Sequence, residues 1–235
     1  MNTKAISKKR PSDLRQVYIS VDFEAIDENV WWSFGLIVSN YPLGNVIQKF
    51  QVGCDRSTHI CENKEINEFW KKHPAAYEAN RLIGGKNTQK EAEWAIVHFI
   101  REIKKKYNFF LISDNPAFDV KILDDILARN GEKAICFRKG DYLQCLDTWT
   151  FRLATMQILG LKSSDLNRVH ANLNRPLREM DFICQDDQTE FPRHTPVFDA
   201  CQLALQYFKV KDISNDFKNR LIGQNNSIYR NQNFR

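Results

Sequence analysis

The chain has 235 residues, of which 43% are hydrophobic and 27% are charged, and it contains six cysteines. This length fits one α/β domain, and the composition excludes a wholly disordered, collagen-like or low-complexity chain. Six cysteines without a C-x-x-C spacing are too few for a disulfide scaffold in a chain of this length, so we expect reduced thiols.

The net charge of +5 is distributed unevenly along the chain. Residues 1–15 and residues 217–235 each carry a net charge of +4, which leaves −3 for residues 16–216. Basic ends can attract the phosphates of a nucleic acid, but they are equally typical of solvated termini. We expect a flexible basic arm over residues 1–15, a single domain over residues 16–222 and a disordered tail over residues 223–235.

Targeting signals are not apparent in the sequence. The first fifteen residues lack the apolar segment of a secretory signal, and no apolar run approaches the length of a membrane span. We therefore expect a cytoplasmic or otherwise intracellular protein with no membrane partner.

Three strands are predicted in the first part of the chain. Residues 16–23 are apolar and β-branched, as in a strand buried on both faces, and residues 31–38 and 46–52 follow with a turn between them at 41–44. Helices are then predicted over residues 65–82, divided by Pro74, and over residues 88–106, where apolar residues recur at helical spacing.

The second part of the chain alternates between strands and helices. The predicted elements are a strand at 108–113, a helix at 116–128, a short strand at 142–146, a helix at 149–159, and helices at 196–208 and 212–221. Residues 160–193 are weakly patterned. Strands first, followed by alternating helices and strands, predict an α/β fold with a mixed sheet flanked by helices.

Two carboxylates lie at the end of the first predicted strand. Because side chains alternate across a strand, Asp22 and Glu24 point to the same side. Two buried carboxylates this close would repel each other and lose hydration, so either they are protonated or they share a cation. The alternative is that Asp22 lies just beyond the strand end and is hydrated.

A third carboxylate begins a later helix. Asn115 is a suitable N-cap and Pro116 suits the first helical position, which places Asp119 one turn into the helix. Asp119 then shares the apolar stripe of that helix, where a carboxylate needs a partner. A favourable helix dipole would explain its place in the sequence but not its inward direction.

The segment around His194 repeats this design. Thr195 can cap a helix that Pro196 opens, and Asp199 falls in its first turns, preceded by phenylalanine as Asp119 is. His194 lies just before the cap, on a loop, where an imidazole can carry a proton.

Taken together, these motifs resemble those of a known enzyme family. Asp22-x-Glu24, Asn115-x-x-Phe-Asp119 and His194-x-x-x-x-Asp199 are similar in order, spacing and element type to the three motifs of the DEDDh 3′-to-5′ exonucleases. The resemblance implies a ribonuclease H-like fold, with three antiparallel strands first and then parallel additions to the sheet. Residues 66–76 further resemble a segment of the bacteriophage exonuclease A and bacterial exoribonuclease branch.

The resemblance also implies a mechanism. Asp22, Glu24, Asp119 and Asp199 would bind two Mg²⁺ or Mn²⁺ ions, His194 would act as general base, and the product would be a nucleoside 5′-monophosphate. Single-stranded RNA or DNA 3′ ends would be the partners, with RNA slightly favoured, and a homodimer is left open. The expected substrate contacts flank the motifs: Phe23, Ala25, Ile26, Trp31, Asn115 and Phe118.

One residue departs from the family pattern. Ala25 stands where the family often has threonine, which removes an expected contact to the terminal nucleotide.

A protein of the same fold could also bind nucleic acid, or act as a scaffold, without catalysis. The presence of all five expected catalytic residue types favours the enzyme.

Overall fold

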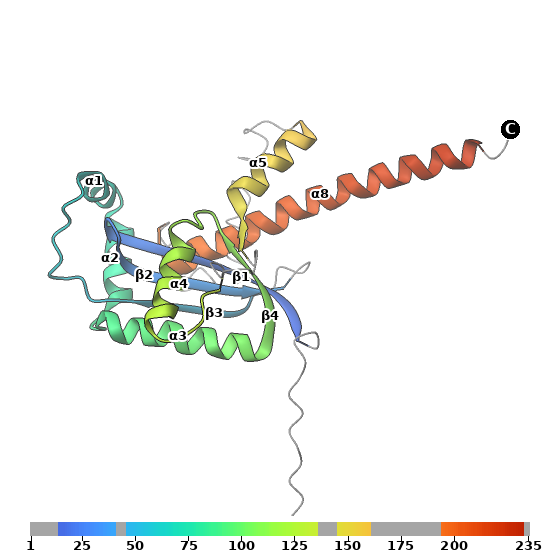
Figure 1. The fold of residues 1–235 in the computed structure, drawn as a ribbon. Helices are drawn as coiled ribbons and strands as arrows, with labels where there is room; N and C mark the ends of the chain where they lie inside the picture. The colour runs from blue at the N-terminus through green and yellow to red at the C-terminus, as the bar shows by residue number, and fades with distance from the viewer. Residues whose placement is uncertain (1–13, 41–45, 136–144, 161–193, 233–235) are drawn as a thin grey trace, which may run out of the picture.

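The structure, a computed structural model, describes residues 14–40, 46–135, 145–160 and 194–232, with side chains described as far as residue 219 (Figure 1). The predicted basic arm lies almost entirely outside the described residues, as do the turn at 41–44 and the weakly patterned segment at 161–193. Within the described residues, no helix is long and apolar enough to cross a membrane.

A five-stranded mixed sheet forms the centre of the described fold, in the order β3-β2-β1-β4-β5. Its strands are β1 (Arg15–Asp27), β2 (Val30–Ser39), β3 (Val46–Gly53), β4 (Tyr107–Ser113) and β5 (Cys145–Asp147). The first three strands pair antiparallel, whereas β4 pairs parallel with β1 and β5 pairs parallel with β4. This arrangement confirms the predicted fold class: three antiparallel strands first, then parallel additions.

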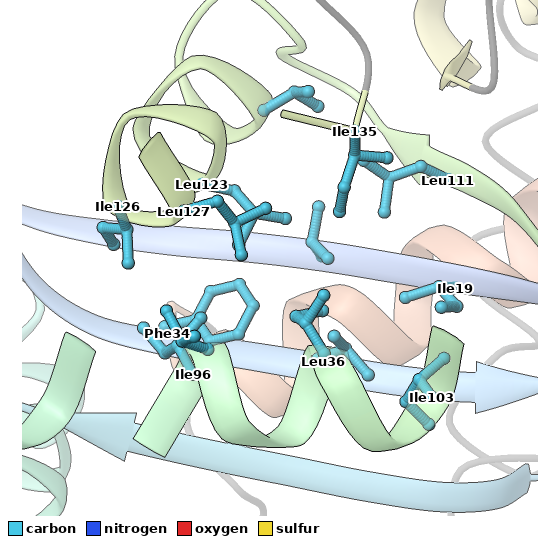
Figure 2. Packing of buried hydrophobic residues seen from close by; sticks show 14 of the residues in the cluster. Ile19, Phe34, Leu36, Ile96, Ile103, Leu111, Leu123, Ile126, Leu127 and Ile135 are labelled. Atoms are coloured by element: carbon cyan, nitrogen blue, oxygen red, sulfur yellow. The ribbon is translucent and has the colours of Figure 1, made fainter. Parts of the chain in front are cut away.

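Helices α3 (Gln89–Lys106) and α4 (Asp119–Arg129) cover one face of the sheet. Their apolar stripes pack against the face of β1 that carries Val17, Ile19 and Val21, so the sheet and both helices share one core (Figure 2). A capping box between Thr88 and Glu91 fixes the start of α3. Burial of this stripe on both helices is the main apolar contribution to the fold.

The opposite face of the sheet is covered by α8 (Pro196–Gln232), which continues beyond the sheet at its C-terminal end (Figure 1). Phe198 and Cys201 pack with Ile37 of β2. Further along the helix, Tyr207 packs against Tyr18 of β1. Helix α5 (Thr148–Leu159) packs against α8. The alternation of β1 therefore directs Tyr18, Ser20, Asp22 and Glu24 toward the side that α8 covers.

The length of α8 differs from the sequence prediction. We expected two helices, ending at residue 221, and a disordered tail from residue 223, but one helix runs without a break to Gln232. No proline occurs between residues 197 and 232, and the single Gly223 costs a helix only about 1 kcal/mol. A lone glycine is thus too weak a signal to end the helix.

Helices α1 (Lys64–Lys72) and α2 (Pro74–Gly84) lie at the end of the sheet where β1 ends and β2 begins. They are separated at His73, as the proline at position 74 predicts. Trp70 of α1 packs against Trp32 and Ile26, and its indole N–H donates to the Ala25 carbonyl at 2.9 Å. The end of β1 is therefore covered by these two helices.

Candidate active site

Asp22 and Glu24 occupy the last regular part of β1, the strand that pairs with both β2 and β4. Asp22 lies opposite Gly35 and Glu24 opposite Ser33, and the pairing with β2 becomes irregular immediately after Glu24. The two side chains share one face, as the alternation predicts.

Asp119 is the first residue of α4 and is buried, with 2% of its surface exposed. Its carboxylate accepts hydrogen bonds from the backbone N–H of Phe23 at 3.1 Å and from the hydroxyl of Ser113 at 2.8 Å. These two bonds connect β1, β4 and α4 at one point. The inward direction predicted for Asp119 is confirmed.

The start of α4 differs from the prediction. Phe118 is the N-cap, and Asn115 makes a turn in which its carbonyl accepts from the N–H groups of Phe118 and Asp119. The Ser113 hydroxyl accepts from the N–H of Asn115 at 3.0 Å, a local bond that stabilises the turn after β4. The prediction that Asn115 caps the helix and Pro116 begins it was wrong.

His194 and Asp199 come from the start of α8. The helix begins at Pro196 as predicted, and the N–H of Asp199 donates to the Thr195 carbonyl at 3.0 Å. Asp199 Oδ2 accepts from the backbone N–H of His194 at 3.0 Å and lies 3.8 Å from its Nδ1. The His194 ring also contacts the rings of Phe69 and His73, at centroid distances of 4.8 and 4.6 Å.

The carboxylates and the imidazole gather into two groups. Oxygen and nitrogen atoms of Glu24, His194 and Asp199 lie within 4.8 Å of one another, and so do oxygens of Asp22, Asp114 and Asp119. All five predicted catalytic residues therefore belong to one or other group.

Asp114 was not singled out by the sequence analysis. It directly follows β4, and the carboxyl end of a strand beside β1 is the signal that could have indicated it.

The electrostatics of the site are unfavourable for four ionised carboxylates. Burial raises the pKa of Asp22 well above its usual range, and the charges of Glu24, Asp119 and Asp199 raise it further. The pKa of Glu24 is likewise raised, by burial first and then by Asp199. Burial raises the pKa of Asp119 to about 7, against the hydrogen bonds from Ser113 and Phe23 that favour its ionised form.

These groups fit a divalent cation. Asp22 Oδ2 is buried and has no hydrogen-bond partner among the described residues, so a buried oxygen lone pair is left without compensation. Carboxylate oxygens are hard ligands of the kind that Mg²⁺ and Mn²⁺ prefer. A cation would offset both the lost hydration of Asp22 and the repulsion from its neighbours.

A cavity of about 470 Å³ opens beside the carboxylates. Its lining includes Asp22, Glu24 and Asp119 together with residues of α1. The residues that α1 contributes are Glu65, Ile66, Phe69 and Trp70. The sequence analysis did not identify Glu65 or Phe69 as site residues, because nothing local indicates that α1 folds over the end of β1.

The predicted substrate contacts divide into two sets. Phe23, Ala25, Asn115 and Phe118 line the cavity. Ile26 and Trp31 do not: Ile26 is 3% exposed and packs with Trp32 and Trp70, and Trp31 is 4% exposed and packs edge-on against Phe23. Irregular pairing between Glu24 and Asp27 turns these two side chains into the core.

The sequence matches no protein-family model and no curated protein. The nuclease domain of 3′hExo, a DEDDh family member, bound to rAMP, is similar to it with 14% identity and a TM-score of 0.47, over 86% of this chain and 94% of that one. An ExoI/SSB-Ct complex is similar with 14% identity and a TM-score of 0.49, over 89% of this chain.

This chain spans 46% of the ExoI chain that it matches. Neither likeness shows what this chain binds or hydrolyses. Function therefore has to be inferred from the site itself.

Proposed function

We propose that this protein is a metal-dependent 3′-to-5′ exonuclease that hydrolyses single-stranded nucleic acid to nucleoside 5′-monophosphates, with RNA slightly favoured over DNA. The observation that carries the proposal is the gathering of Asp22, Glu24, Asp119, Asp199 and His194 into two groups, with Asp22, Glu24 and Asp119 lining an open cavity. Three chain segments far apart in sequence supply these groups, at a cost in buried charge that a purely structural role does not explain.

The carboxylates would hold two divalent cations, Mg²⁺ or Mn²⁺. Bound there, the cations would stabilise the charge on the attacking and the leaving oxygen of a phosphodiester displacement. Asp22 belongs to the group with Asp114 and Asp119, and the charges of Glu24 and Asp199 also raise its pKa, so its carboxylate would help to hold cations in either group.

His194 would accept the proton of the attacking water. Its backbone N–H is held by Asp199 and its ring packs against Phe69, which together restrict where the imidazole can point. A general base of this kind contributes roughly 10²- to 10⁴-fold to the rate.

The apolar walls of the cavity would hold a terminal nucleotide. Phe69 and Ile66 of α1 and Phe118 line it, and aromatic faces stack on bases without reading sequence. Phe23 and Ala25 line it as well, and the Ala25 carbonyl is already bonded to Trp70. Asn115 adds a polar side chain to the lining.

The test uses a 5′-labelled single strand, prepared as RNA and as DNA of the same sequence, with Mg²⁺ or Mn²⁺. We expect a ladder of products shortened from the 3′ end and release of 5′-monophosphates, with both lost in Asp22→Asn and both slowed by roughly 10²- to 10⁴-fold in His194→Ala. Asp125→Asn is the matched control, because Asp125 is exposed on α4 and pairs only with Lys121 in the contacts observed.

Two results would overturn the proposal. An equal ladder from the wild type and from Asp22→Asn would show that the cleavage comes from elsewhere. Tight binding of the strand with no cleavage under either metal would favour the alternative, a catalytically silent nucleic-acid-binding protein or scaffold.

A further inference from the structure

Asn80 is a polar side chain on α2 with no solvent-exposed surface. All of its amide atoms are hydrogen-bonded: Oδ1 accepts from the Ser33 hydroxyl at 2.5 Å, and Nδ2 donates to the carbonyls of Ala76 at 3.0 Å and of His194 at 2.7 Å. The bond to Ala76 lies within α2, whereas the other two join segments 47 and 114 residues away. An amide with both protons and its oxygen engaged has one orientation.

His194 needs such support because of its backbone conformation. Its φ is +68°, in the left-handed region that residues other than glycine enter at a cost of about 1–2 kcal/mol. This conformation turns the chain into Pro196, the first residue of α8, and directs the His194 carbonyl toward α2. The short bond from Asn80 is made to this carbonyl and holds the turn.

The same amide connects His194 to the central sheet. Ser33 of β2 is the residue paired with Glu24 of β1, so the contacts run from Glu24 through Ser33 and Asn80 to His194. The segment that carries the imidazole is thereby fixed relative to a strand that carries two of the carboxylates.

We infer that Asn80 is a positioning residue for His194: it holds the backbone turn that keeps the imidazole beside Glu24 and Asp199, and it does not itself take part in the reaction. The inference rests on the proposed function, in which His194 is the general base. Displacement of a catalytic group by about 1 Å can cost on the order of 10²-fold in rate, so loss of this single bond is expected to lower kcat.

The test is a double-mutant cycle between Asn80→Ala and His194→Ala, measured as kcat and KM on the single strand. We expect Asn80→Ala to lower kcat by roughly 10- to 100-fold with little change in KM, and to have almost no further effect when His194 is already alanine. Ala76→Gly is the matched control on the same helix, since it weakens α2 but leaves a carbonyl for Asn80 to bond; its kcat should stay near that of the wild type.

A purely structural role for Asn80 predicts a different pattern. An equal loss of kcat from Asn80→Ala in both backgrounds, or the same loss in Ala76→Gly, would overturn the inference. So would an Asn80→Ala variant with unchanged kcat.

A second readout separates this inference from the proposed function. In protein labelled with ¹⁵N-histidine, the His194 amide resonance, assigned by its absence in His194→Ala, should shift in Asn80→Ala and not in Ala76→Gly. If the wild type cleaves nothing, the proposed function fails, and the amide resonance still decides whether Asn80 holds the turn. An unmoved resonance in Asn80→Ala would overturn the positioning role.

Discussion

Gly35 of β2 lies directly against the backbone of Pro196, where α8 begins. A Cβ added to Gly35 would fall 2.1 Å from the Pro196 carbonyl carbon and 2.3 Å from the Val197 nitrogen, far inside van der Waals contact. Gly35 is also the residue paired with Asp22. The absent side chain therefore lets the first turn of α8 approach the sheet beside Asp22, which is what brings Asp199 to the other carboxylates.

Gly35→Ala is expected to push the start of α8 away from the sheet. Because the contact is with backbone that cannot rotate away, we expect the free energy of unfolding to fall by about 3 kcal/mol, at the upper end for overpacking. The rise in melting temperature on adding Mn²⁺ should shrink as well, since Asp199 moves with the helix. Urea unfolding and thermal scans with and without Mn²⁺ measure the two effects.

Gly131→Ala is the control for this prediction. An added Cβ at Gly131 meets nothing within 4 Å, but its φ of +74° makes any side chain strained, at a cost of about 1 kcal/mol. This variant should lose stability and keep its full response to Mn²⁺. A Gly35→Ala variant that responds to Mn²⁺ as Gly131→Ala does would contradict the proposed role of the glycine.

Asp22→Asn separates stability from metal binding. Removing one of several mutually repelling buried carboxylates should raise the free energy of unfolding of the metal-free protein by about 1 kcal/mol at pH 8. The same change should abolish stabilisation by Mn²⁺, which in the wild type reaches about 2.7 kcal/mol at 100 times the dissociation constant. Chelated and Mn²⁺-loaded samples compared by urea unfolding test both parts.

Asp125→Asn again provides the comparison for Asp22→Asn. Its carboxylate is exposed and pairs with Lys121, so stability and the Mn²⁺ response should both stay close to the wild type. If Asp22→Asn lowers the stability of the chelated protein, the carboxylates do not repel one another in the way the geometry indicates.

The residues of β1 show how much of the site the sequence alone could predict. Strict alternation separates Val17, Ile19 and Val21 from Asp22 and Glu24, and the structure places these sets on opposite faces. The positions of the first three strands and the start of α8 followed from equally local signals. The periodicity of apolar residues and the residue preferences at helix ends are properties of short segments, so they can be recognised directly in a sequence.

What could not be predicted depends on segments distant in sequence. Asn80 and His194 are separated by 114 residues, and nothing near either one indicates that they meet. Asn115 precedes a turn over residues 116–118 instead of capping α4, and the helix begins only at Asp119, whose carboxylate bonds to Ser113 and to the N–H of Phe23 on a distant strand. The contribution of α1 to the cavity, including Phe69, is likewise a consequence of tertiary structure.

Asp119 makes the stability of the metal-free protein depend on pH. Its pKa is raised to about 7 in the folded state, against about 3.9 in an unfolded chain. Between these values the folded protein binds more protons than the unfolded chain, so this carboxyl's contribution is fully present below about pH 4 and is lost as the pH rises to about 7.

The pH prediction is checked against Asp119→Asn, which has no proton to lose at this position. The free energy of unfolding of the wild type minus that of the variant, in chelator, should fall between about pH 4 and pH 7 and then level off. Stabilisation by Mn²⁺ should grow over the same interval, because ligands must be deprotonated to bind. A difference that is flat or rises with pH would show that Asp119 is ionised throughout.

Asp27 fixes the connection between β3 and α1, and with it one wall of the cavity. Its carboxylate accepts from the backbone N–H groups of Glu28, Glu62 and Asn63 at 2.8–3.2 Å, and it contacts His59 Nε2 at 3.1 Å. These bonds hold the pKa of Asp27 well below its usual range. In Asp27→Asn an amide N–H₂ replaces one acceptor oxygen and faces those donors, so the connection between β3 and α1 should be held less firmly. We expect KM for the single strand to rise by about 3- to 10-fold, with a smaller change in kcat.

Asp55→Asn is the matched change in the same connection, because Asp55 is exposed and its carboxylate accepts from Ser57, its neighbour two residues along the chain. It should leave KM near the wild-type value. Stability that depends on Asp27 is present above the unfolded pKa of about 3.9 and is lost as the pH falls further, so the two variants should converge in stability in strong acid. Equal KM values for Asp27→Asn and Asp55→Asn would mean that α1 is held in place without this carboxylate.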